Sequence, residues 1–95
     1  MKDMTMPRKR ESWPDEDYLE EAHKHCRLNR AELQSSSRCG CFYCFALFAP
    51  DDIVEWVDQD QTAICPNCPV DSVIGSASGY PITGEFLQRM HDKWF

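Results

Sequence analysis

The stretches CGCFYC at residues 39–44 and CPNC at residues 65–68 decide the fold of this 95-residue chain. Both contain two cysteines separated by two residues. This spacing lets both sulfur atoms of a pair face one tetrahedral ion, and two such pairs fill all four positions around it. We therefore predict one structural Zn²⁺, with iron as the alternative metal, bound by Cys41, Cys44, Cys65 and Cys68.

Two further cysteines lie outside these pairs. Cys39 could replace Cys41 as a ligand, but a Cys39–Cys44 pair would need a longer loop, so we predict that Cys39 does not bind the metal. Cys26 is expected to be a small core residue. Arg38 would favour the thiolate of its neighbour Cys39, which leaves a redox role open for that residue.

Length and composition indicate a single domain that benefits from a metal. Apolar residues make up 42% of the chain, enough for a packed but modest core at this size. No stretch approaches the roughly 18–20 apolar residues of a membrane span, and the charged start lacks the apolar segment of a signal peptide. We expect a cytoplasmic protein with no membrane partner, whose cysteines are metal ligands or free thiols.

The fold class expected is small α+β, built as a zinc-ribbon or knuckle module between two helices. A flexible arm at 1–11 precedes a single zinc-binding domain at 12–95. This domain comprises a long N-terminal helix at 14–34, a zinc module at 39–75 and a C-terminal helix at 83–94.

Helical periodicity supports the first of these helices. Ser12 can cap it and Pro14 fits its first turn. Its predicted inward face comprises Tyr18, Ala22, His25, Asn29 and Leu33. The last helix is expected to follow a cap at Thr83 and to bury Phe86, Leu87, Met90, His91 and Trp94.

The zinc module contains several short predicted elements. Pro50 is expected to open a short helix, and residues 62–64 to form a strand of a hairpin that delivers Cys65. The buried side of the short helix would comprise Ile53, Val54, Trp56 and Val57. Aromatic residues near the first cysteine pair are expected mostly to pack in the core; they are Phe42, Tyr43 and Phe45.

Polar residues on the inward helix face need partners if they are buried. We predict that His25 and Asn29 hydrogen-bond the backbone or the surroundings of the metal ligands, as Cys39, Asp71 and Ser72 also could. The alternative is a small active or binding site made by these histidine, asparagine, aspartate and serine side chains. His23 is expected to be exposed.

The combined motifs resemble a family of small, uncharacterised bacterial proteins that are described only as cytoplasmic proteins. They are CGCFYC at 39–44, CPNC at 65–68, DSVIG at 71–75, YPIT at 80–83, and the C-terminal Met90-His91 and Trp94-Phe95. The resemblance covers about residues 22–95 and includes His25 and Asn29. It implies a bacterial or phage origin and a zinc-ribbon-like module, and it implies no activity.

One position departs from this resemblance. Pro69 follows the second cysteine pair, where glycine is typical of the family. Glycine allows a left-handed turn that proline does not, so the local turn is expected to differ.

The charge distribution bears on the choice of partner. The net charge is −6, and residues 39–95 carry all of it, with two basic and eight acidic side chains. Such a surface repels phosphates and suits a basic protein surface. We expect a protein-interaction module, such as an adaptor, an inhibitor or an immunity-type factor, and not an enzyme.

Two other functions stay open. A nucleic-acid-binding zinc ribbon is the alternative, because Arg27, Arg30, Arg38 and the basic run at 7–10 could contact phosphates. The least favoured function is a small enzyme that uses the predicted site of His25, Asn29 and Asp71.

Overall fold

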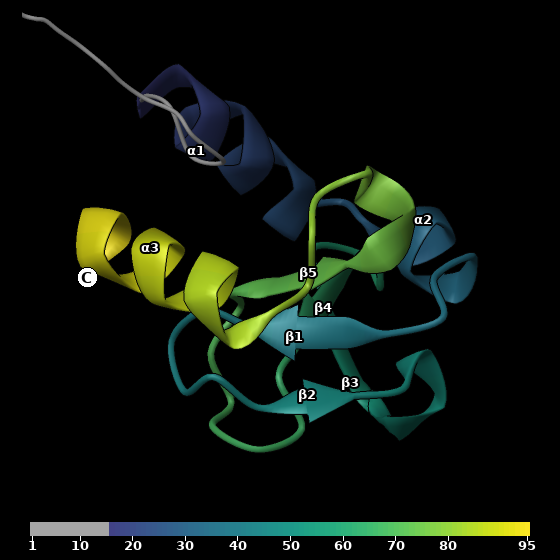
Figure 1. Ribbon diagram of the computed structural model, residues 1–95. Coiled ribbons are helices and arrows are strands. Elements are labelled where there is room, and N and C mark those ends of the chain that lie inside the picture. Colours follow the sequence, from purple (N-terminus) through teal and green to yellow (C-terminus); the bar gives the residue numbers. More distant parts are fainter. Residues whose placement is uncertain (1–15) are drawn as a thin grey trace, which may run out of the picture.

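Two small antiparallel sheets lie at the centre of the computed structural model, and helices pack around them (Figure 1). The structure describes residues 16–95. The predicted arm at 1–11, the cap at Ser12 and the helix start at 14 therefore lie outside the described residues. An α+β fold with a four-cysteine cluster is present, as the sequence predicted.

The larger sheet has the strand order β2-β1-β5. Its strands are β2 (Leu47–Phe48), β1 (Cys39–Cys41) and β5 (Val73–Gly75). In the central strand, Gly40 lies opposite Leu47 on one side and Ile74 on the other. A β-carbon at Gly40 would lie 3.0 Å from methyl groups of Ile82 and Leu87, so glycine permits the close packing of this strand.

The smaller sheet is a hairpin of β3 (Glu55–Val57) and β4 (Thr62–Ile64). Asp58, Gln59 and Asp60 in its turn all have left-handed backbones, with φ between 54° and 68°. The strand predicted at 62–64 is confirmed, and Cys65 follows it directly.

The prediction of one continuous helix at 14–34 is wrong. Within the described residues it is divided into α1 (Glu16–His23), the 3₁₀-helix η1 (Lys24–Cys26) and α2 (Arg30–Gln34). The break lies at Leu28, which has a φ of 50°. The Leu28 N–H donates to Thr62 Oγ1 at 2.8 Å, so a tertiary hydrogen bond to β4 replaces the helical one.

The short helix predicted to start at Pro50 is also largely wrong. Only a single 3₁₀ turn forms, η2 (Pro50–Asp52), and the chain then enters β3. Ile53 is buried as predicted, but Val54 is 84% exposed. A short apolar run does not distinguish helix from strand, and pairing with β4 determines the outcome here.

The C-terminal helix α3 (Gly84–Trp94) follows the 3₁₀-helix η3 (Ser76–Ser78) and confirms the helix predicted at 83–94. Thr83 is its N-cap, and Thr83 Oγ1 accepts a hydrogen bond from the Phe86 N–H at 3.2 Å. The helix buries Phe86, Leu87 and Met90, whereas the predicted burial of Trp94 is wrong because this side chain is exposed.

Two apolar clusters form among residues 16–95, and both include a residue of β5. The first, between α1, α3 and the larger sheet, includes Leu19, Ala22, Cys26, Phe42, Ile74, Ile82, Phe86, Leu87 and Met90. The second lies toward the hairpin and includes Leu33, Cys39, Cys41, Ile53, Ala63, Cys65 and Val73. Among residues 16–95, no helix is long and apolar enough to cross a membrane.

Candidate metal centre

The sulfur atoms of Cys41, Cys44, Cys65 and Cys68 lie within 4.8 Å of one another. The Cys41–Cys68 and Cys44–Cys65 sulfurs are 3.6 and 3.7 Å apart. Zinc–sulfur bonds of about 2.3 Å in a tetrahedron place the sulfurs about 3.8 Å apart, whereas a disulfide needs about 2.05 Å. The four side chains could therefore hold one metal ion.

Each cysteine pair is shaped by the loop that carries it. Cys41 ends β1 and Cys44 lies in the next turn, while Cys65 follows β4. The Tyr43 N–H donates to Cys41 Sγ at 3.4 Å, and the Asn67 N–H donates to Cys65 Sγ at 3.3 Å. The two loops thus repeat one geometry, in which a backbone N–H stabilises negative charge on the first sulfur of each pair.

Within the described part of the chain, the side chains of Ser72 and Asn67 contact the sulfur cluster. Ser72 Oγ lies 3.1 Å from Cys41 Sγ, and a thiolate at Cys41 would accept a hydrogen bond from this hydroxyl. Asn67 Nδ2 donates to Cys44 Sγ at 3.4 Å. Sequence reasoning proposed Ser72 and missed Asn67, although its position between two cysteines was a signal.

The pKa values of Cys44 and Cys68 are shifted in opposite directions. Burial alone would raise the pKa of Cys44, but hydrogen bonds from Asn67 and its other neighbours lower that pKa to about 7. Burial and the neighbouring sulfurs of Cys41 and Cys44 raise the pKa of Cys68. Four adjacent thiolates repel one another, so full ionisation needs a bound cation.

The residue after each cysteine pair has a left-handed backbone. Phe45 has a φ of 68° and Pro69 has a φ of 28°. Glycine adopts this region without steric cost, but neither position carries glycine. The second turn therefore keeps a left-handed backbone despite the proline that departs from the family resemblance.

Cys39 and Cys26 are buried outside the four-sulfur cluster. Burial and Asp52 raise the pKa of Cys39 to about 11, and burial and Asp71 raise the pKa of Cys26 to about 11. The expectation that Arg38 favours a Cys39 thiolate is wrong, because the thiol is held neutral. Cys26 lies in the first apolar cluster, as predicted.

Asn29 is 3% exposed and connects three parts of the fold. Its Nδ2 donates to the carbonyl oxygens of His25 and Val73, each at 2.9 Å, and its Oδ1 accepts from the Ala63 N–H at 3.3 Å. The side chain therefore joins η1 to both sheets. Asn29 thus hydrogen-bonds the backbone, as we predicted.

The other predicted polar residues have separate partners. His25 Nδ1 lies 2.9 Å from a carboxylate oxygen of Glu32. Asp71 is exposed, and its charge acts on Cys26 and His23. His23 is half-buried, not exposed as predicted, because its ring packs 4.1 Å from the ring of Trp94.

An aromatic surface lies beside the first cysteine pair and comprises Tyr43, Phe45, His91 and Phe95. The rings of Tyr43 and Phe95 are 4.8 Å apart, and those of Phe45 and His91 are 5.1 Å apart. Tyr43 and Phe45 are 44% and 39% exposed, so the prediction that most of these aromatics are core residues holds only for Phe42.

Comparison of the chain with known protein families, with curated proteins and with solved structures found no match.

Proposed function

We propose that this protein is a protein-interaction module whose fold is stabilised by one structural Zn²⁺. The observation that supports it is the four-sulfur cluster at Cys41, Cys44, Cys65 and Cys68. Protein sulfurs would fill all four tetrahedral positions around a bound ion, which would leave no position for a water molecule or substrate. Closed coordination of this kind is typical of structural zinc, and all-sulfur ligand sets suit zinc or iron.

The charge around the cluster favours a protein partner. Residues 51–60 contain five acidic side chains and no lysine or arginine. Four thiolates and one zinc ion add about two more negative charges. A surface of this sign attracts a basic protein and accelerates association with it. The adaptor, inhibitor and immunity-type roles, and a bacterial or phage origin, belong to this proposal.

A second candidate function is nucleic-acid binding, and the exposed aromatic surface favours it. Tyr43 and Phe45 could stack on unpaired bases, which contributes about 1–3 kcal/mol per base in single-strand-binding proteins. Phosphate binding also needs cations, but residues 39–95 contain only Arg89 and Lys93. We therefore place this candidate second.

The test is reconstitution with purified components. The zinc-loaded protein is used to capture partners from a host extract, and each captured protein is then purified and titrated calorimetrically at about 0.15 M salt, the physiological range. Saturable binding with defined stoichiometry is the expected result. Labelled single- and double-stranded DNA and RNA are titrated in parallel.

Either of two results would reject the proposal. One is that no purified candidate binds the protein. The other is submicromolar binding to one of the nucleic acids, with loss on Tyr43→Ala but not on Val54→Ala, an exposed apolar control.

A further inference from the structure

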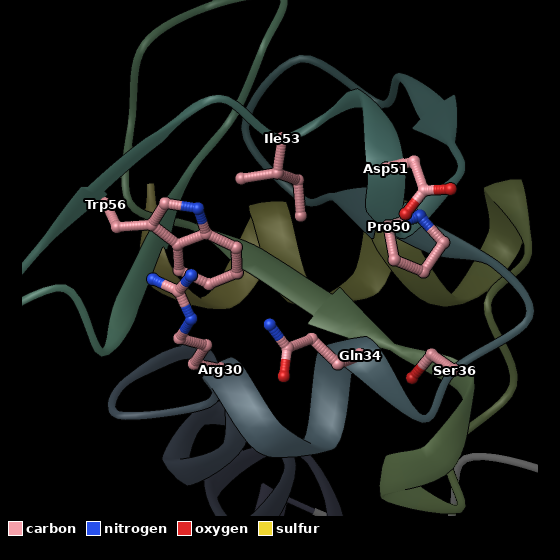
Figure 2. A pocket seen from close by; sticks show the side chains of 7 residues that line it. All are labelled: Arg30, Gln34, Ser36, Pro50, Asp51, Ile53 and Trp56. Carbon is pink, nitrogen blue, oxygen red and sulfur yellow. The ribbon is translucent and has the colours of Figure 1, made fainter.

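A cleft of about 420 Å³ lies between α2 and the segment that contains η2 and β3 (Figure 2). This volume falls within the range of about 300–1,000 Å³ that is usual for ligand sites. Its lining comprises Arg30, Gln34, Ser36, Pro50, Asp51, Ile53 and Trp56. The cleft contains none of the four clustered cysteines, so it is a separate feature of the molecule.

Arg30 is held in place at one end of the cleft. Its guanidinium carbon lies 4.6 Å from the centre of the Trp56 ring, and Figure 2 shows the two groups stacked. Its Nη1 donates to the Asp60 carbonyl at 2.9 Å. The remaining guanidinium N–H groups make no hydrogen bond within residues 16–95. Because the guanidinium is already fixed, its further N–H donors can bind an oxygen acceptor at little entropic cost.

Two more polar groups face the cleft without a partner in the described part of the chain. The Gln34 amide points into it from α2, and the Asp51 carboxylate lies on the opposite wall (Figure 2). Pro50, Ile53 and Trp56 also line the cleft. Donors, an acceptor and an apolar surface therefore converge on one space, as in sites that orient a ligand.

The acidic side chains around the cleft indicate which class of ligand it would bind. Asp51 belongs to the acidic segment 51–60, which also contains the exposed apolar residue Val54. A phosphate-rich ligand would be repelled by this segment. A ligand with cationic and apolar side chains and with carbonyl acceptors would match all the groups present.

We propose that this cleft binds an extended segment of a basic protein partner. Backbone carbonyls of the segment accept hydrogen bonds from Arg30 and Gln34, a lysine or arginine pairs with Asp51, and an aliphatic side chain packs on Trp56 and Ile53. This inference rests on the proposed function and assigns it a surface and a partner chemistry.

The experiment selects ligands from a phage-displayed library of nine-residue peptides with the full-length, zinc-loaded protein as bait. Selected peptides are expected to share a lysine or arginine next to an aliphatic residue. A synthetic selected peptide should lose tenfold or more in affinity on Asp51→Asn and on Gln34→Ala. Chemical-shift mapping of each variant checks that the fold and the zinc centre are intact.

Asp58→Asn is the matched control, because it removes the same charge from the same segment but lies outside the cleft. Asparagine also tolerates the left-handed backbone found there, with its φ of 54°. This variant should retain binding within about twofold. If Asp51→Asn and Asp58→Asn lowered peptide affinity equally, the acidic segment would attract cations without a specific site, and the proposal would be overturned. Selection of peptides without basic residues would also overturn it.

The chain's own basic run at 7–10 is a competing occupant. Replacing Arg8, Lys9 and Arg10 together by glutamine in the full chain tests it. A tenfold gain in peptide affinity would show that this run fills the cleft, and would overturn the proposal of a separate partner. Unchanged affinity would support it.

This test separates the two proposals. If a purified partner binds and Asp51→Asn and Gln34→Ala leave its Kd unchanged, the proposed function stands and the cleft is the wrong surface. If no protein partner binds at all, both proposals fail.

Discussion

Residues after the cysteine pairs combine an unfavourable backbone with an unexpected side chain. Phe45 and Pro69 both adopt positive φ where glycine would be free of steric cost. Proline prefers a φ near −65°, so a φ of 28° at Pro69 strains the chain. Strain of this kind costs about 1–3 kcal/mol per residue. Interactions of the surrounding loop must offset this cost, and Pro69 directly follows Cys68 of the four-sulfur cluster.

Replacing this proline by glycine should therefore stabilise the protein. Pro69→Gly removes the strain but increases the conformational freedom of the unfolded chain, which offsets about 0.4–1 kcal/mol of the gain. We expect a net increase of about 1 kcal/mol in the free energy of unfolding. Urea denaturation at one fixed free-zinc concentration measures it.

Pro66→Gly serves as the control, because Pro66 lies in the same loop and does not have a positive φ. It should lower stability, since the unfolded chain gains freedom and no strain is relieved. A Pro69→Gly variant that is no more stable than the original protein would show that the loop accommodates the proline without strain.

At the scale of single residues, the spacing of the cysteines predicted the four-sulfur cluster. The two-residue spacing acts locally, so it identified the four sulfurs that cluster and excluded Cys39 without knowledge of the fold. Exposure of Tyr43 and Phe45 was not predictable in the same way. Apolar residues favour the core, but a small domain cannot bury them all, and the sequence does not say which remain outside.

At the scale of secondary structure, a tertiary hydrogen bond decides where the predicted N-terminal helix is interrupted. The inward positions of the predicted helix were largely correct, since Ala22, Asn29 and Leu33 are buried. Its continuity was wrong, because the Leu28 N–H bonds Thr62 instead of a helical carbonyl. No glycine or proline marks this break. A contact between residues 34 positions apart decides it, and local propensity does not report such contacts.

Asn29 connects these elements, and its removal should be costly. Asn29→Ala leaves the Val73 carbonyl and the Ala63 N–H without their side-chain partner in a buried region. Buried unsatisfied groups cost about 1–3 kcal/mol. We expect a loss of about 2–3 kcal/mol in the free energy of unfolding, measured by urea denaturation at fixed free zinc.

Gln61→Ala is the control, because Gln61 is exposed and its hydrogen bonds come from its backbone. It should change stability by less than about 0.5 kcal/mol, as is usual for surface substitutions. If Asn29→Ala cost no more than this control, water would satisfy the two backbone groups and the asparagine would not hold the sheets together.

At the scale of the whole fold, the described residues form two apolar clusters, and cooperative unfolding depends on how these are joined. Neighbouring residues of one strand contribute to different clusters, as Val73 and Ile74 do in β5. Cys41 ends β1 and Cys65 follows β4, and these two strands belong to different sheets. A metal bound by both pairs would therefore cross-link the two sheets, and both clusters depend on β5.

Removing the metal should consequently unfold the described domain as a unit. Structural zinc contributes about 10–16 kcal/mol in comparable small modules at neutral pH, as much as the whole stability of about 5–15 kcal/mol of an ordinary domain. Without it, four crowded thiols replace the cross-link, and the second cluster loses Cys41 and Cys65 as anchored members. Chelation should abolish dispersed amide signals from α3 and from the hairpin together, and elemental analysis should find one zinc per chain before chelation.

Cys65→Ser should reproduce the loss without chelator, whereas Cys26→Ala, a buried cysteine outside the sulfur cluster, should retain the metal and the dispersed spectrum. Loss of metal on Cys39→Ser but not on Cys41→Ser would instead mean that Cys39, and not Cys41, is the first ligand. If the metal-free protein kept the spectrum of the zinc-loaded protein, the two apolar clusters would hold the sheets together without the metal, and the prediction would be wrong.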